Sequence, residues 1–337
     1  MTRNKMVQTS SSKDLILRSS GDRLVRMLGW SILGFLLAFL LNNFLSVVYD
    51  FPGPISLIYK KSVLGTVQLA IYVLIILLFN FICVIKTQNT LRLESERLHK
   101  FNVFLIRWFF LSILFIGVVD VSIAVLRVEK LLPLMTSDTV VSLLNRPKFV
   151  GGYIHIPIFA ICFFAAILLR TLGFTWLALL IVIAELMIVI TRFVFSYEQP
   201  FMADLVRYWY AALFLFASAY TLYDEGHVRV DIAYAGLSSQ TKGLLNAIGS
   251  IILGVSTSLS IVVISFNGKF SIINKPLMSF EVSQTGTVGM FIKYQLALFL
   301  GIFGVTMVIQ FVSYFFESVA DYRNYAGKRS VVASGSH

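Results

Sequence analysis

The sequence predicts an all-α integral membrane protein with about eight transmembrane helices and both termini in the cytoplasm. Hydrophobic residues make up 58% of its 337 residues and charged residues only 13%, with a mean hydropathy of +0.84. This is about half the charge of a soluble domain. The 30 Phe, 14 Tyr and 4 Trp suit lipid contact and interfacial belts. A water-soluble globular protein is therefore excluded.

The net charge of +11 does not indicate a nucleic-acid partner. The basic residues are spread through the connections between apolar stretches and form no basic domain. Their distribution is typical of a membrane protein that keeps its positive loops on the cytoplasmic side.

The chain begins with a polar segment, residues 1–26, which is too poor in apolar residues to insert or to fold alone. We expect a cytoplasmic tail. The apolar stretch that follows is too long for a signal peptide and ends without small residues for cleavage, so we interpret it as a retained span.

Eight apolar stretches are long enough to cross a hydrocarbon layer of about 30 Å as helices. They are approximately Met27–Tyr49, Val63–Ile85, Phe101–Leu126, Gly151–Leu169, Thr171–Phe195, Ala203–Leu222, Gly243–Phe266 and Gly289–Phe316. In the long connection 127–150, Ser137 and Asp138 are placed to cap a short helix that reaches Leu144 on the outer membrane surface.

The basic residues test this topology. With the N-terminus inside, 16 Lys or Arg fall on the inner side and 10 on the outer side, which favours both termini in the cytoplasm. The weakest boundary is Arg170, because residues 151–195 could also form one long bent helix, which would invert the second half. We prefer two helices with an inner hairpin at Arg170 and Gly173.

The densest run of charge in the chain is Tyr223-Asp224-Glu225-Gly226-His227-Val228-Arg229-Val230-Asp231. It follows an apolar stretch, so it lies where a span meets water. His227, Arg229 and Asp231 alternate with two valines, a period of two that places the three polar groups on one side. That side could face a partner, or the run could be a solvated loop that keeps a helix end in the headgroup region.

The segment 220–234 and the following Leu237-Ser238-Ser239-Gln240-Thr241-Lys242 resemble the signature of the small, DctQ-like membrane subunit of tripartite ATP-independent periplasmic (TRAP) transporters. Upstream, Thr191-Arg192-Phe193-Val194-Phe195 resembles the end of that family's first helix. The likeness runs from about Thr171 to Arg323. Because such subunits usually have four helices, the resemblance implies an enlarged version.

This resemblance implies a domain plan and partners. We expect a tail at 1–26, an additional four-helix membrane region at 27–170, a small-subunit-like four-helix region at 171–323, and a C-terminal tail at 324–337. The partners implied are a separate large subunit, which carries sodium ions and a small organic acid, and an extracytoplasmic substrate-binding protein. The chain itself would be a stator in the bacterial inner membrane, without catalytic residues, metal or cofactor. Asp224, His227, Arg229, Asp231 and Arg192 would be its motif or interface residues.

Charged residues within spans are costly and usually functional. Glu185 lies two turns before Arg192 and near the depth that Arg207 and Lys293 reach, each roughly 10 Å inside the outer boundary. We expect Arg207 or Lys293 to neutralise Glu185 and tie the last helices together. Contact with the partner subunit and ion transport are the alternatives.

Asp120 and Arg107 on the third expected span are interpreted as groups near a boundary that reach water or headgroups.

The histidines do not support a haem site. His155 lies at the start of a span on the outer side of the membrane, whereas His99 and His227 lie in loops on the inner side. The prolines fall in loops or first turns, so the helices read as unbroken, unlike the interrupted helices of carriers. A membrane-embedded enzyme or stand-alone permease, with a site assembled from distant residues, is the alternative function.

Overall fold

The computed structural model of the chain describes residues 20–85, 90–224, 234, 236–283 and 286–328. Helices and no strands are found in these residues, which confirms the all-α class. Seven of the described helical segments are long and apolar enough to cross a membrane. They are Gly21–Val48, Val63–Ile85, Leu91–Val128, Pro147–Leu168, Phe174–Val194, Ser239–Ser265 and Lys293–Tyr322.

The eighth expected span is also a helix, α11 (Pro200–Tyr223), but it is not among the seven. Its 24 residues are long enough to cross the hydrocarbon layer. It carries Asp204, Arg207 and several tyrosines. Its buried side chains include Tyr208 and Trp209. That α11 spans the membrane remains a prediction.

Three short helices occupy the connection after α5 (Leu91–Val128). They are α6 (Leu132–Met135), α7 (Asp138–Leu144) and α8 (Pro147–Val150). The expected helix from Asp138 is confirmed as α7, and Ser137 before it has the extended backbone of an N-cap residue. Its side chain makes no capping hydrogen bond.

The boundary at Arg170 separates two helices. Helix α9 (Ile156–Leu168) ends before it, and α10 (Phe174–Val194) begins after Gly173, whose φ of 83° favours glycine. Arg107 on α5 donates to the carbonyls of Ala166 (3.2 Å) and Arg170 (3.0 Å). These are carbonyls that the end of a helix leaves without intrahelical donors. The two-helix interpretation is confirmed, and Arg107 contacts backbone where we expected water or headgroups.

Two of the expected spans contain a π-helical turn. The first, η1 (Gly151–His155), precedes α9, and the second, η2 (Ser250–Val255), joins α13 (Ser239–Gly249) to α14 (Ser256–Ser265). In η1 the Ile156 N–H donates to the Gly151 carbonyl, five residues back. Pro157 has no N–H to donate to the preceding turn, which gives a physical reason for the displaced ladder. The helices continue through these turns, but they are not regular throughout.

The chain divides into two compact units. Unit 1 comprises residues 1–100, 221–260 and 307–337, and unit 2 comprises residues 101–220 and 261–306. Each unit draws on both halves of the chain, and α5, α11, α14 and α16 (Lys293–Tyr322) contribute to both. The division at residue 170, which rests on the resemblance, stays a prediction about sequence and does not describe the packing.

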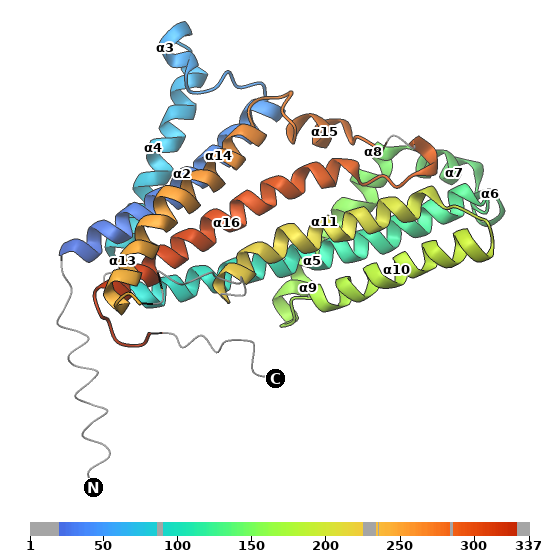
Figure 1. The fold of residues 1–337 in the computed structure, drawn as a ribbon. Coiled ribbons are helices and arrows are strands. Elements are labelled where there is room, and N and C mark those ends of the chain that lie inside the picture. Colours follow the sequence, from blue (N-terminus) through green and yellow to red (C-terminus); the bar gives the residue numbers. More distant parts are fainter. Residues whose placement is uncertain (1–19, 86–89, 225–233, 235, 284–285, 329–337) are drawn as a thin grey trace. The chain divides into compact units, whose positions relative to one another are not determined.

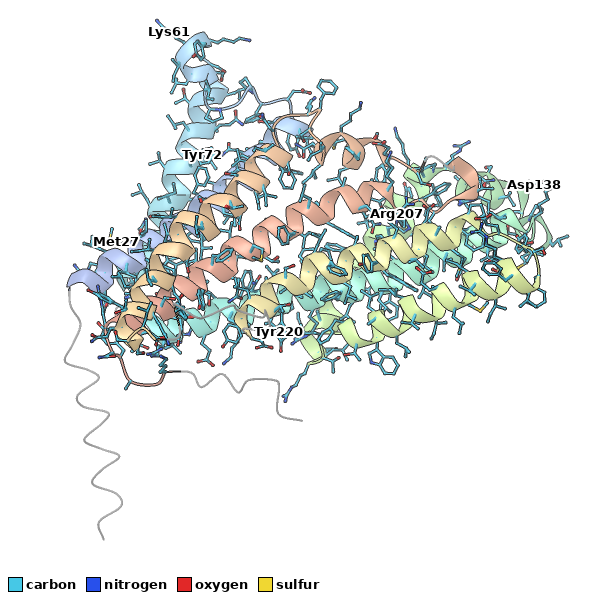
Figure 2. The ribbon with its side chains drawn as sticks, in the orientation of Figure 1. Met27, Lys61, Tyr72, Asp138, Arg207 and Tyr220 are labelled. Carbon is cyan, nitrogen blue, oxygen red and sulfur yellow. The ribbon has the colours of Figure 1, made fainter. Side chains whose placement is uncertain are left out.

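In unit 1, α2 (Ser20–Val48) packs along α4 (Val63–Ile85), and α3 (Ser56–Lys60) precedes α4 (Figure 1). Two polar contacts join the pair, from Asn80 Nδ2 to Ser31 Oγ (2.8 Å) and from Gln68 Nε2 to Ser46 Oγ (3.0 Å). Lys61 lies at the α3 end of α4 and Tyr72 lies farther along it (Figure 2). Most of the apolar surface of α4 is exposed, as expected of a span that faces lipid.

In unit 2, α5 and α11 run side by side (Figure 1). Gly117 of α5 allows the close approach of α11, because a Cβ there would lie 2.3 Å from the Trp209 ring nitrogen. The rings of Phe110, Phe216 and Phe299 pack edge to face. The unit also holds α15 (Asn274–Ser279) and the short turn η3 (Gly286–Val288).

Candidate functional site

The charged signature begins where α11 ends. Tyr223 is the last residue of the helix, and Asp224 follows it as an exposed residue. His227, Arg229 and Asp231 lie outside the described residues, so their roles remain predictions. The described residues on either side show what holds the two ends of this segment.

Before the segment, Tyr223 lines a cavity of about 230 Å³ in unit 1. Its ring stacks on the imidazole of His99. His99 Nδ1 lies 3.1 Å from the side-chain oxygen of Gln310 on α16. The charged signature therefore begins beside a polar, partly enclosed cavity at the end of α11. The cavity is lined by Arg92, Ser95, Glu96, Tyr223, Ser313, Tyr314, Glu317 and Gly327.

Arg92 contacts four acceptors beside this cavity. Its guanidinium lies 2.5 Å from Glu317 Oε1 and 2.8 Å from Asp321 Oδ1, and it also donates to the carbonyls of Tyr325 and Ala326. A planar guanidinium can satisfy several acceptors at fixed angles, which an ammonium cannot. The start of α5 is thus fastened to the end of α16.

After the segment, the signature becomes the start of α13. Ser238 is the N-cap residue, and its Oγ accepts the N–H of Thr241 at 3.2 Å. Farther along α13, Asn246 donates to the hydroxyls of Tyr234 (2.8 Å) and Tyr314 (3.1 Å). The second half of the motif therefore has a local structural explanation, which is helix capping and anchorage to α16.

The expected pairing of Glu185 is not found among the described residues. Glu185 is exposed on α10. Arg207 lies 3.9 Å from Asp204 one turn earlier, and Lys293 pairs with Glu281 at 2.5 Å. Arg192 is exposed near the end of α10.

Carboxylates and a guanidinium from the helices of unit 2 hold the segment that precedes α16. Asp204 accepts the N–H of Met290 (3.2 Å) and the Ser283 hydroxyl (3.1 Å). Arg127 lies over the ring of Phe291, 4.0 Å from its centroid, and donates to the Gly289 carbonyl. Backbone groups that no helix can satisfy are thus paired with side chains, as an apolar setting requires.

A buried hydrogen-bond network, the His155 cluster, lies in unit 2. Its members are Asp120 of α5, His155 of η1, Tyr208 of α11, and Tyr294 and Gln295 of α16. Asp120 and His155 are each only 2% exposed, and Tyr208 is 0% exposed. The expectation that Asp120 reaches water or headgroups is therefore wrong. The π-helical turn at Gly151–His155 presents the imidazole to these partners.

The distances assign a donor and acceptor scheme to the cluster. His155 Nε2 lies 3.2 Å from Asp120 Oδ1, and the other Asp120 oxygen accepts the N–H of Phe291 at 2.8 Å. A carboxylate only accepts, so His155 carries its proton on Nε2 and its Nδ1 is an acceptor. Tyr294 Oη (2.8 Å) and Gln295 Nε2 (3.0 Å) face that Nδ1.

The remaining groups close the network. Gln295 Nε2 also lies 2.9 Å from Tyr294 Oη, and Tyr208 donates its hydroxyl proton to Gln295 Oε1. As an acceptor, His155 Nδ1 has one lone pair, which can take a proton from either Tyr294 or Gln295. An Asp–His pair can orient a catalytic base, but here both ring nitrogens are bound by buried protein groups. The arrangement is suited to joining four helical elements. Among the described residues, no group of three His, Cys, Asp or Glu side chains could hold a metal ion.

Sequence reasoning missed this cluster because its members come from four separate helical elements; His155 is 35 residues from Asp120 and 140 residues from Gln295. One local signal was present. Gly151-Gly152 followed by Pro157 at the start of an apolar stretch indicates an irregular helical turn, and His155 lies inside it.

Comparison with known proteins gives one match. The family model of the DctQ component of tripartite ATP-independent periplasmic transporters matches residues 178–321. These residues run from the second turn of α10 to the last turn of α16. Neither a curated protein nor a solved structure matches the chain. Residues 178–321, which include the charged signature and its flanking helices, are thus similar to the DctQ component of the TRAP transporters.

Proposed function

We propose that this chain is the small permease subunit of a TRAP transporter and that it acts as a non-catalytic stator beside a separate large subunit. The observation that carries the proposal is the DctQ match over residues 178–321. The match covers α10, α11, α13 with α14, and α16, so it includes a set of long helices and the signature between α11 and α13.

Buried polar contacts between helices favour a role as a rigid stator. A stator must resist tilting while its partner moves, and this requires contacts that fix neighbouring helices. In unit 2, the His155 cluster joins α5, η1, α11 and α16 through buried hydrogen bonds. In unit 1, Glu94 of α5 accepts from Arg26 (2.9 Å) and Trp30 (3.2 Å) of α2. Breaking a buried pair by removing one partner costs about 3 to 5 kcal/mol.

Proline positions also favour a wall over a moving carrier. Carriers build substrate sites from paired helices that are interrupted near the bilayer midplane. Among the described helices, Pro133, Pro147 and Pro200 lie at N-terminal positions and Pro276 lies in the short helix α15. Pro157 follows the π-helical turn η1 inside the continuous helical segment Pro147–Leu168. The two π-helical turns distort a ladder without ending the helix. Substrate movement is therefore assigned to the partner.

The rest of the proposal follows from the sequence resemblance. The word tripartite in the family description supports a complex with other components. On this proposal, those components are a large membrane subunit and an extracytoplasmic substrate-binding protein. The large subunit would couple sodium entry to uptake of a small organic acid across a bacterial inner membrane. The additional helices before α10 would widen the stator.

Co-purification tests this assignment. The neighbouring open reading frames should encode a large membrane subunit of about twelve spans and a soluble protein with a signal peptide. We expect the affinity-tagged chain, expressed with that large subunit, to bring it down from detergent as a stoichiometric complex. An unrelated multispan membrane protein expressed at the same level is the control. Failure to co-purify, with the tagged chain folded and monodisperse, would reject the proposal.

A further inference from the structure

Glu185 is a carboxylic acid in the middle of an apolar helix, on its exposed side. It is the twelfth of the 21 residues of α10, about 16 Å from the first Cα and about 14 Å from the last along the helix axis. The side chain is exposed, and within the described residues it makes no hydrogen bond or ion pair. A free carboxylate at this depth in hydrocarbon is costly, so such groups normally have a partner.

The residues around Glu185 define a stripe on α10. Val182, Glu185, Val189 and Arg192 recur at intervals of three and four residues, so they lie on one side of the helix. All four are exposed, with Val182 at 64% and Val189 at 50%. The side of α10 that packs inside unit 2 is different, because it consists of Leu177, Ile181 and Ala184. We call the four exposed residues the Glu185 stripe.

We propose that the Glu185 stripe docks against a membrane helix of the large TRAP subunit that presents a basic side chain or another hydrogen-bond donor at mid-depth. This inference rests on the proposed function and names the surface that performs it. Three observations carry it: a carboxyl group with no partner among the residues that the structure describes, the exposed valines that flank it, and the position of Glu185 inside the region that matches the DctQ model.

The chemistry disfavours a second copy of this chain as the occupant. In a membrane dimer the two-fold axis is parallel to the membrane normal, so equivalent helices lie at equal depth. Glu185 would then face another Glu185, and like charges repel. The basic residue of the stripe, Arg192, lies seven residues farther along, about 10 Å deeper or shallower. A different chain with a donor at the level of Glu185 satisfies the carboxylate without this conflict.

Site-specific photocrosslinking tests the surface while leaving Glu185 intact. A photoreactive amino acid is placed at Val182 or Val189 in the stripe. The matched controls are Ile183 and Ile190, which have the same spacing and depth but lie farther around the exposed side of α10. We expect the stripe positions to give at least about fivefold more crosslink to the large subunit than the controls.

Several outcomes would overturn the inference. These are equal yields from the two pairs, crosslinks from the stripe to a second copy or to the chain's own helices, or lipid adducts alone. If the large subunit co-purifies but the stripe does not reach it, the proposed function stands and this inference fails. If the large subunit does not co-purify at all, the proposed function itself fails.

Substitution of Glu185 gives an independent readout. A buried charged hydrogen bond at an interface is strong, so Glu185→Leu should weaken binding of the large subunit at least about tenfold. Glu185→Gln keeps an acceptor and should weaken it less than about threefold. Ile183→Leu is the control. Because Glu185 is exposed in the isolated chain, all three variants should remain monodisperse. Equal and normal binding by the Leu variant would contradict the proposal.

Discussion

His155 Nε2 lies 3.2 Å from Asp120 Oδ1, and both side chains are 98% buried. The same carboxylate accepts the backbone N–H of Phe291, so one residue of α5 fixes both the irregular turn before α9 and the segment before α16. A buried hydrogen-bonded carboxylate stabilises a membrane helix bundle only while all its hydrogen-bond donors are present.

Removing one partner should therefore destabilise the isolated chain. We expect Asp120→Leu to leave the Phe291 N–H and the His155 N–H unpaired, at a cost of about 3 to 5 kcal/mol. The midpoint of heat-induced loss of monodisperse protein in detergent should fall by about 5 to 10 °C. Asp120→Asn retains an acceptor, so its midpoint should fall less than that of Asp120→Leu. The control is Asp138→Asn, because Asp138 is exposed on α7. No difference between Asp120→Leu and the control would contradict the structural role.

Arg92 offers a second test, in unit 1. Arg92→Lys keeps the positive charge but cannot match the four acceptors that the guanidinium contacts, so the apparent melting midpoint should fall for Lys and further for Ala. Hydrogen bonds to charged groups contribute about 1.5 to 3 kcal/mol each. Arg97→Ala on the same helix is the matched control, since Arg97 is exposed. A Lys variant as stable as the parent would show that charge alone accounts for the contact.

The topology predicts which positions are accessible from each side. With both termini inside, a single cysteine at Ser137, in the connection that carries α7, should react with an impermeant maleimide in intact cells. A cysteine at position 227 should react only after the membrane is opened. The reverse pattern, with Ser137 labelled only from the cytoplasmic side, would reject the orientation that the basic residues predict.

We expect the charged signature to contribute to binding between this chain and the large subunit. Arg229→Ala and Asp231→Ala should each reduce the amount of large subunit that co-purifies, by the equivalent of about 2 to 5 kcal/mol if the pair is buried at an interface. Substrate capture by the isolated binding protein should not change. Val228→Ala, between the polar residues, is the control. Normal co-purification with an altered sodium dependence of uptake would place the segment in the transport path.

The length and apolarity of the spans could be predicted from sequence because a hydrocarbon layer demands about 20 apolar residues in each helix. The hairpin at Arg170 followed from the same requirement. The partners of Glu185, Arg207 and Lys293 could not be predicted, because spacing gives depth along a helix but not the direction in which each helix turns its side chains. In the structure, Lys293 pairs with Glu281, and Glu185 is exposed.

The His155 cluster shows a second limit. Asp120 was interpreted from its position near the end of an expected span, yet a hydrogen-bond partner contributed by another helix decides whether such a carboxylate is buried. The partner that matters most here, the N–H of Phe291, is a backbone group, so residue identity carries no signal for it. The π-helical turn that places His155 was indicated only by Gly151, Gly152 and Pro157.

The measurement that tests the central claim most directly is substrate uptake by proteoliposomes under an inward sodium gradient, with the loaded binding protein outside. Vesicles with this chain alone should show no uptake, and vesicles with both membrane subunits should accumulate substrate. The large subunit alone should be inactive or strongly impaired, because its support is missing. Sodium-dependent uptake by vesicles that contain only this chain would contradict the account, since the chain would then carry the substrate itself.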